Sequence, residues 1–328
     1  MSRKILTVSV AAYNMEKYLN ECLDSMAIPE IAEDLEVFVI DDGGTDRSLE
    51  IAQAYATRYP NTFIPVHKKN GGWGSTVNYS MQHATGKYFK ILDGDDWFDK
   101  DGFVRLVHML KTSEADVITS GFYFAMGNAR KLEKGYEGVD HKIRKIQEVI
   151  HDLPVLKLPE LCYRTEILMS SSLKLPEHMF YCDLYYQTIP FVFAQSIQSL
   201  GCPVVIYRIG REGQSVSVSS KLKHQDEYVS ICKDLIDFMS KLDKTQVENY
   251  PYLVKRMATT YRGTFSVLRL NPINKGSLRK IKQLEDYLKK NLKDVYSYTM
   301  LHGGKYMWLL RKSNYLSYWI SPLLRKKT

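Results

Sequence analysis

The chain of 328 residues is 45% hydrophobic and 25% charged, with no low-complexity segment or internal repeat, so it can bury one large or two smaller cores. Its net charge is +8, yet no recognisable nucleic-acid module accompanies this charge, and we expect no nucleic-acid partner. The five cysteines show neither a disulfide framework nor a zinc-ligand spacing.

Four short apolar runs in the first third of the chain each end in polar residues. They lie near residues 6–14, 35–40, 62–67 and 87–92, and helical spacing follows the first three of them, with Thr45 or Asp46 as the expected cap of the second helix. This alternation predicts an α/β fold with a mostly parallel sheet, whose ligand crevice lies outside the carboxyl ends of the strands. The polar residues at these ends should converge on one cleft: Tyr13, Asp41, Asp42, Asn70, Asp93 and Asp95.

The fourth run ends at Asp93, Gly94, Asp95 and Asp96, which puts three carboxylates within four residues. Carboxylates that close repel one another unless they stay hydrated or share a divalent cation. A solvated acidic turn is the alternative interpretation, because turns favour Asp and Gly for backbone reasons. The neighbouring polar strand ends favour the metal site.

Three motifs, in this order, resemble the family 2 glycosyltransferases, which are inverting enzymes with the GT-A nucleotide-diphospho-sugar transferase fold. The motifs are residues 8–14 with 18–19, residues 39–46, and residues 93–96. The resemblance is dense over residues 4–125, thinner over 160–216, and absent beyond. It implies a Rossmann-like sheet flanked by helices.

Carried over position by position, the resemblance implies two sets of donor-site residues. The nucleotide-sugar would be held by Ala11, Tyr13, Asn14, Asp41, Asp42, Asn70, Gly71, Asp93 and Gly94, with Asp42 facing the base and Asp41 supporting the loop beside it. Asp93 and Asp95 match the Asp-x-Asp pair that the family uses on the ribose and on Mg²⁺ or Mn²⁺. Hard oxygen ligands suit such a cation, which would neutralise the departing nucleotide diphosphate.

Two later segments resemble further parts of the family's active site. In residues 175–186, Cys182 stands where the family has a Glu, which leaves Asp183 as the predicted catalytic base for the acceptor hydroxyl. Helix capping by Asp183 is the alternative. In residues 207–217, Arg211, Gln214 and Ser215 are predicted to close over the diphosphate or the acceptor, although a surface loop would look similar.

Helical apolar spacing at residues 226–242, 252–270 and 278–292 predicts a helical C-terminal region, so we expect a catalytic domain over residues 1–216 and a helical region over 217–328. Residues 275–328 hold 13 Lys and Arg against 3 Asp and Glu. Within them, residues 306–327 mix aromatic, aliphatic and cationic residues, and Arg311 with Lys312 interrupts the apolar run too early for a membrane span.

This basic aromatic segment is therefore predicted to lie on a membrane surface. The alternative is a helix docked on the protein's own core or on another subunit. In the second case the protein would be a homo-oligomer. Because residues 1–4 lead straight into the first strand without an apolar signal segment, we expect a cytoplasmic protein, peripheral on the inner face of the cell membrane.

The expected function is an inverting, metal-dependent transfer of a sugar from a UDP-sugar to a hydroxyl of a growing cell-surface glycan, which could be lipid-linked. Nucleotidyl or phosphoryl transfer is an alternative, although the chain lacks the Gly-x-x-x-x-Gly-Lys phosphate loop. A dinucleotide oxidoreductase would need a glycine fingerprint after the first strand, where residues 11–14 have none. A non-catalytic membrane-docking subunit that keeps the fold is the remaining alternative, suggested by Cys182.

Overall fold

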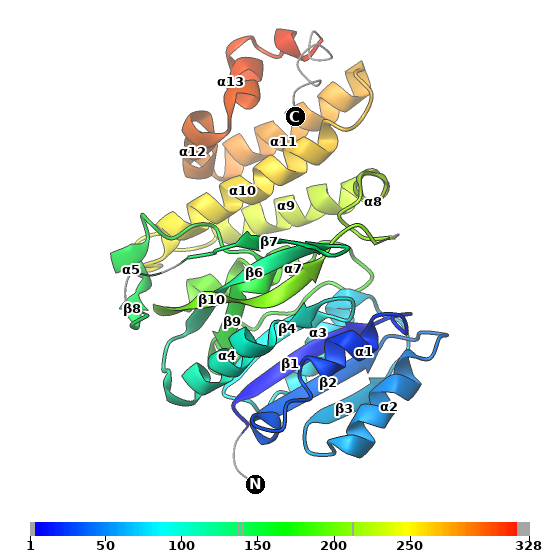
Figure 1. Cartoon of the computed structure of the whole chain (residues 1–328). Coiled ribbons are helices and arrows are strands. Elements are labelled where there is room, and N and C mark those ends of the chain that lie inside the picture. Colours follow the sequence, from blue (N-terminus) through cyan, green and yellow to red (C-terminus); the bar gives the residue numbers. More distant parts are fainter. Residues whose placement is uncertain (1–3, 137, 139–140, 212, 320–328) are drawn as a thin grey trace. The chain divides into compact units, whose positions relative to one another are not determined.

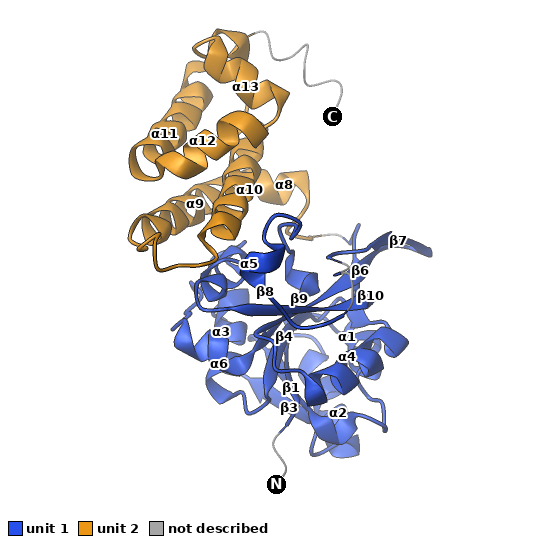
Figure 2. Ribbon diagram, turned by 90° about the vertical axis from the view of Figure 1, so that its left-hand side faces the viewer, with its two compact units in different colours: residues 1–212 blue, residues 213–328 orange. Residues whose placement is uncertain are grey.

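The computed structural model describes residues 4–136, 138, 141–211 and 213–319. The chain forms two compact units, residues 1–212 and residues 213–328 (Figure 2). The first contains the sheet and the second is helical.

Within the described residues, a ten-stranded mixed sheet forms the centre of the first unit (Figure 1). Four strands, β1 (Leu6–Ala12), β2 (Leu35–Asp41), β3 (Phe63–His67) and β4 (Tyr88–Asp93), pair in parallel in the order β3-β2-β1-β4. Every residue of β2 is buried, as expected for a parallel strand covered on both faces. All four strands end at the same edge of the sheet.

The rest of the sheet continues from β4 in the order β9-β6-β10-β5, with β7 on β6 and β8 on β10. These strands are β5 (Trp97–Phe98), β6 (Val117–Met126), β7 (Ala129–Glu133), β8 (Arg144–Lys145), β9 (Leu161–Arg164) and β10 (Ser196–Arg208). Only the β6–β10 pair among them is parallel. The predicted α/β class is confirmed, with the parallel part confined mainly to the N-terminal strands.

Helices flank this sheet: α1 (Leu19–Asp24), α2 (Ser48–Arg58), α3 (Trp73–His83), α4 (Lys100–Thr112), and the short α5 (Ile146–Val149), α6 (Thr165–Ser170) and α7 (Asp183–Tyr186). The N-cap residue of α2 is Arg47, which makes no side-chain cap hydrogen bond, so neither Thr45 nor Asp46 takes the predicted cap position. Asp46 still supports this end of the helix, because its Oδ1 accepts the backbone N–H of Ser48 at 2.9 Å. Its other oxygen accepts the N–H of Glu16 at 2.8 Å, which ties α2 to the loop after β1. Asp99 caps α4 by accepting the N–H of Gly102.

The second unit consists of α8 (Val218–Lys223), α9 (Gln225–Ser240), α10 (Tyr250–Leu268), α11 (Lys275–Asn291), α12 (Lys293–His302) and α13 (Lys305–Lys312), followed by a 3-10 turn at Leu316–Tyr318. The three helices predicted from apolar spacing are α9, α10 and α11. A buried ion pair joins α13 to α11: Arg311 Nε lies 2.6 Å from Glu285 Oε1, and the two side chains are 4% and 5% exposed.

The basic aromatic segment divides between the core and the surface of this unit. Met307, Leu310 and Tyr318 are buried, whereas Trp308, Leu316 and Trp319 are exposed. The rest of the predicted segment, residues 320–327, lies outside the described residues. In the described part of the chain, no helix is both long enough and apolar enough to span a bilayer.

Candidate active site

The end of β1 contributes three of the predicted nucleotide-binding residues. Ala11 lies opposite Asp93 in the β1–β4 ladder, and Tyr13 follows with its side chain exposed. Asn14 adopts a left-handed backbone conformation with a φ of 54°, and its Oδ1 accepts the N–H of Thr45 at 2.9 Å. This bond holds the loop after β2 against the end of β1.

Asp41, the last residue of β2, supports the same loop from the other side. Its Oδ1 accepts the N–H of Gly44 at 2.9 Å, and its Oδ2 lies 2.6 Å from His67 Nδ1. A Cβ on Gly44 would lie 2.6 Å from Asp41 Oδ1, so a larger residue there would displace this carboxylate oxygen. The loop is therefore held in place by the buried Asp41 carboxylate.

Asp42 holds the next loop and is almost completely buried, with 2% exposure. Its Oδ1 accepts from Lys68 Nζ at 2.8 Å and from the N–H of Gly71 at 3.0 Å, while its Oδ2 accepts the N–H of Gly72 at 2.8 Å. Asn70 Nδ2 donates to the Asp42 carbonyl oxygen at 2.8 Å. These bonds hold the Asp42 carboxylate in a fixed position, and among these donors only the Gly72 N–H bonds to Oδ2.

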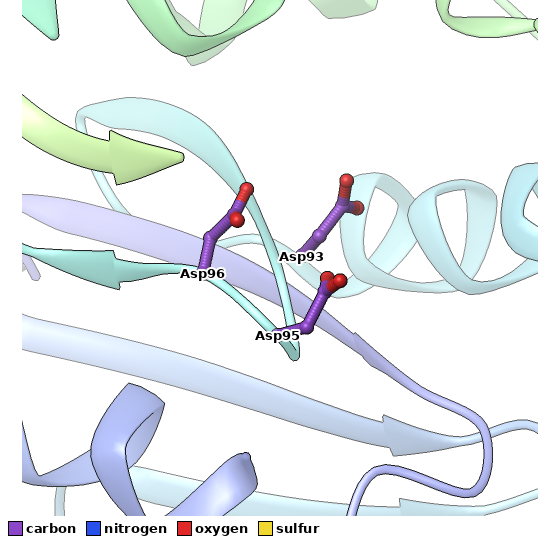
Figure 3. A group of neighbouring side chains, drawn as sticks. All are labelled: Asp93, Asp95 and Asp96. Carbon is purple, nitrogen blue, oxygen red and sulfur yellow. The ribbon is translucent and has the colours of Figure 1, made fainter. Parts of the chain in front are cut away.

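The acidic residues after β4 form a compact cluster in a tight turn. One oxygen from each of Asp93, Asp95 and Asp96 lies within 4.8 Å of the others (Figure 3). The N–H of Asp96 donates to the Asp93 carbonyl at 2.9 Å, and the N–H of Gly94 donates to the Ala11 carbonyl at 3.0 Å. A Cβ on Gly94 would lie 2.7 Å from that carbonyl oxygen, so the turn depends on a glycine.

Two side chains from distant parts of the chain contact the predicted Asp-x-Asp pair. Trp73 Nε1 donates to Asp93 Oδ1 at 2.6 Å, and Arg211 Nε lies 2.7 Å from Asp95 Oδ2. Arg211 was predicted from the sequence, whereas Trp73 was not. The available signal for Trp73 was its place two residues after Gly71, which the resemblance assigns to the nucleotide-sugar site.

Arg208 is a second residue that sequence analysis missed. Its backbone N–H donates to Asp96 Oδ1 at 2.8 Å and its Nε donates to the Asp95 carbonyl at 2.9 Å. Its guanidinium lies over the rings of Trp97 and Tyr18, at 4.5 Å and 4.9 Å from their centroids. Arg208 ends β10, so this contact depends on the antiparallel pairing of β10 with β5.

Burial of these carboxylates leaves their negative charges poorly compensated. Burial, followed by the charge of Asp95, raises the pKa of Asp93 to about 7, although the bond from Trp73 opposes the rise. Burial, followed by the charges of Asp93 and Asp95, raises the pKa of Asp96 well above its ordinary value. A hard divalent cation would offset this repulsion, and the donor set of carboxylate oxygens is the one that Mg²⁺ and Mn²⁺ prefer.

Asp183 is the first residue of α7, directly after the buried Cys182. Its Oδ2 accepts a hydrogen bond from Gln187 Nε2 at 2.5 Å. The charge of Asp183 also contributes to the raised pKa of Asp93, so the two carboxylates share one electrostatic environment. The residue at the N-cap position is Cys182, one position before Asp183.

The segment before α7 is attached to α3 and to the loop that precedes it. The Asn78 amide exchanges two hydrogen bonds with the backbone of Leu175, at 2.8 and 2.9 Å. The N–H of His178 donates to the Gly71 carbonyl at 2.7 Å. A Cβ on Gly74 would lie 2.3 Å from the carbonyl oxygen of Pro176, so this close approach also depends on a glycine.

Comparisons with known proteins agree with this geometry. The family described as glycosyl transferase family 2 matches residues 7–168, which include β1 from its second residue, β2 to β4 and the acidic cluster. A glycosyltransferase of Mycoplasma pneumoniae, the MG025 homolog, is 30% identical over 244 residues, which cover 72% of this chain and 77% of that protein. This chain belongs to glycosyl transferase family 2.

This family 2 glycosyltransferase is also similar to a second curated relative and to a solved structure. The poly(ribitol-phosphate) beta-glucosyltransferase of Bacillus spizizenii is 24% identical over 222 residues, covering 65% of this chain and 34% of that protein. The chain thus spans about a third of that relative's length. The structure of S. aureus TarS residues 1–349 in complex with UDP-GlcNAc has a TM-score of 0.66 at 20% identity, covering 89% of this chain and 82% of that one, which shows a shared fold.

The three residues predicted for the closing loop of the glycosyltransferase fall in different units. Arg211 belongs to the first unit and pairs with Asp95. Gln214 and Ser215 belong to the second unit, and their contact with the diphosphate or acceptor stays a prediction.

Replacing Asp93 with Asn is expected to stabilise the metal-free glycosyltransferase in mild alkali. The pKa of Asp93 is about 7 in the folded protein and 3.8 in the unfolded chain, so the folded state favours the protonated carboxyl. The resulting stabilisation is fully present below pH 3.8 and is lost as the pH rises through 7. The neutral amide keeps an acceptor for Trp73 Nε1 and removes the repulsion. At about pH 8 the free energy of unfolding should rise by roughly 1–2 kcal/mol, a discounted figure because part of the Asp93 side chain stays exposed to solvent.

Thermal unfolding in chelator at about pH 8 and about pH 5 measures this difference, which should shrink at the lower pH. The exposed Asp101, changed to Asn, is the control for a lost surface charge. An Asp93→Asn variant that unfolds at the wild-type temperature at both pH values would contradict the prediction.

Proposed function

We propose that this family 2 glycosyltransferase transfers a hexose from a UDP-sugar, with inversion, to a hydroxyl of a growing cell-surface glycan. The observation that carries the proposal is the cluster of three carboxylates at the end of β4, beside the ends of β1 and β2. The TarS structure with this fold was solved with UDP-GlcNAc, which supports a UDP-sugar donor. The B. spizizenii relative is a glucosyltransferase named for poly(ribitol-phosphate), which supports a polymeric cell-surface acceptor.

In this proposal Asp93 and Asp95, with Asp96 beside them, would hold Mn²⁺ or Mg²⁺. The cation would supply charge neutralisation at the diphosphate leaving group. Arg211, which pairs with Asp95 at 2.7 Å, has a planar guanidinium whose paired donors also fit phosphate oxygens. Tyr13 and Asn14, with the loop held by Asp41 and Asp42, would bind the nucleoside.

Asp183 would accept the proton of the acceptor hydroxyl as that oxygen attacks the anomeric carbon. Gln187, which donates to Asp183 Oδ2, would orient the carboxylate. The attachment of residues 175–178 to α3 fixes the segment that leads into α7. Asp183 is therefore fixed in position, and its charge acts on the donor-site carboxylate Asp93.

A screen of UDP-sugars for release of UDP, with Mn²⁺ and with chelator, tests the proposed reaction. We expect one UDP-sugar to give metal-dependent UDP release that increases when a glycan acceptor is added. Release of UMP in place of UDP would favour phosphoryl transfer of the sugar phosphate, and release of the sugar phosphate would favour nucleotidyl transfer of UMP to the acceptor. No turnover with any donor and acceptor would favour a non-catalytic subunit.

We also propose that the glycosyltransferase is peripheral on the cytoplasmic face of the cell membrane. Trp308, Leu316 and Trp319 are exposed within a region of strongly positive net charge, and aromatic side chains beside Lys and Arg suit the lipid interface. A second copy of the chain is the alternative partner of this surface.

Changing Trp308, Leu316 and Trp319 to Ala should weaken binding to anionic vesicles by about tenfold or more, since exposed apolar side chains supply much of interfacial affinity. Truncation is a poorer test, because it would remove Arg311 and leave Glu285 buried without its cation. The control changes the exposed Met126 and Leu132 of the first unit to Ala. Equal vesicle binding by all three proteins would remove the membrane proposal, and a loss of self-association would favour the second copy.

A further inference from the structure

A pocket of about 450 Å³ lies at the junction of α11 and α12 in the second unit. It is lined by Asp286, Lys289 and Lys290 of α11 and by Lys293, Tyr296 and Ser297 of α12. Lys293 is the first residue of α12, so the positive end of that helix dipole adds to the charge of the lysines.

The three lysines of the pocket carry charges that the fold leaves unneutralised. Within the described residues, none of their ammonium groups lies within ion-pair distance of a carboxylate, although Lys289 Nζ lies 5.7 Å from the centre of the Tyr296 ring. Asp286 adds one negative charge to the lining, which leaves the pocket with a net +2. Like charges gathered in one hollow favour an anion.

The same face of α12 continues from the pocket into an exposed apolar side chain. Lys293, Ser297 and Leu301 follow one another at intervals of four residues, which places them along one face of the helix. Leu301 is 82% exposed. Cationic groups and a hydroxyl followed by an exposed leucine match the order of polar headgroup and apolar chain in a phospholipid.

We propose that this pocket binds the phosphate group of an anionic phospholipid. The lysines and Ser297 contact the phosphate and Leu301 contacts the apolar part of the lipid. The inference deepens the proposed membrane association and rests on it, but it uses residues separate from Trp308, Leu316 and Trp319.

The test compares the full-length protein with two variants of equal net charge on vesicles of phosphatidylcholine, with and without phosphatidylglycerol. The pocket variant changes Lys289, Lys290 and Lys293 to Gln. The control variant changes Lys241, Lys275 and Arg279 to Gln, three exposed cations of the same unit. We expect the pocket variant to lose about tenfold or more in affinity for phosphatidylglycerol vesicles, and the control to lose less than about threefold.

Equal losses in the two variants would overturn the site, because the general positive field would then explain the binding. Titration with inorganic phosphate separates a lipid from a soluble ligand: phosphate binding that the pocket variant loses, with unchanged vesicle binding, would overturn the lipid assignment. Thermal unfolding and UDP release are expected to stay at wild-type values in the pocket variant. If the pocket variant loses vesicle binding but keeps UDP release, the loss is due to the pocket and not to the catalytic site. The variant of Trp308, Leu316 and Trp319 tests the rest of the membrane proposal separately.

Discussion

Changing Asp183 to Asn should lower the rate of glycosyl transfer by about 10²–10⁴-fold, the usual contribution of a general base. The amide is nearly isosteric and its oxygen still accepts a hydrogen bond from Gln187, but it cannot take up the acceptor's proton. Binding of Mn²⁺ and of UDP should stay close to wild type. The measurements are product formation under saturating donor and acceptor, and separate titrations with Mn²⁺ and UDP.

The matched control is Asp101→Asn, which removes a carboxylate from the first turn of α4 in the same unit and should leave transfer unchanged. Unaltered turnover in Asp183→Asn would disprove the assignment of the base. Loss of UDP and Mn²⁺ binding together with turnover would instead show that Asp183 maintains the donor site.

Changing Asp95 to Asn should lower transfer by more than about 100-fold and weaken Mn²⁺ binding as well. Asp95 is buried, one of its oxygens pairs with Arg211, and it belongs to the cluster whose oxygens lie within 4.8 Å. Loss of its charge would remove the proposed cation ligand and weaken the attraction that holds Arg211. Titration of Mn²⁺ and Mn²⁺-dependent UDP release together separate this effect from that of Asp183→Asn.

Changing Arg211 to Gln should change the affinity for Mn²⁺ in the direction opposite to Asp95→Asn. Because the guanidinium pairs with Asp95, its removal should tighten Mn²⁺ binding in the absence of donor while lowering transfer. If Asp95→Asn binds Mn²⁺ as tightly as wild type, or if Arg211→Gln binds it more weakly, Asp95 is not a metal ligand.

The strands, the main helices and the family could be predicted from the sequence because each depends on a pattern of residues close together in the chain. The apolar runs that end at Asp41 and Asp93 predicted parallel strands, and in-register pairing then brings their polar ends to one edge. The short spacing of Asp93, Asp95 and Asp96 predicted the acidic cluster for the same reason. Helical periodicity likewise predicted α9, α10 and α11.

The contacts that tune the site depend on residues far apart in the chain. Trp73 and Asp93 are 20 residues apart in the sequence, and Arg211 and Asp95 are 116 apart, so no local sequence pattern predicts either hydrogen bond. The division of the basic aromatic segment into buried and exposed side chains was also decided by tertiary packing, because Arg311 finds its partner Glu285 on another helix. Amino-acid order determined which groups stand at each strand end, whereas the folded chain decided which donors and charges surround them, and these surroundings set the pKa of Asp93.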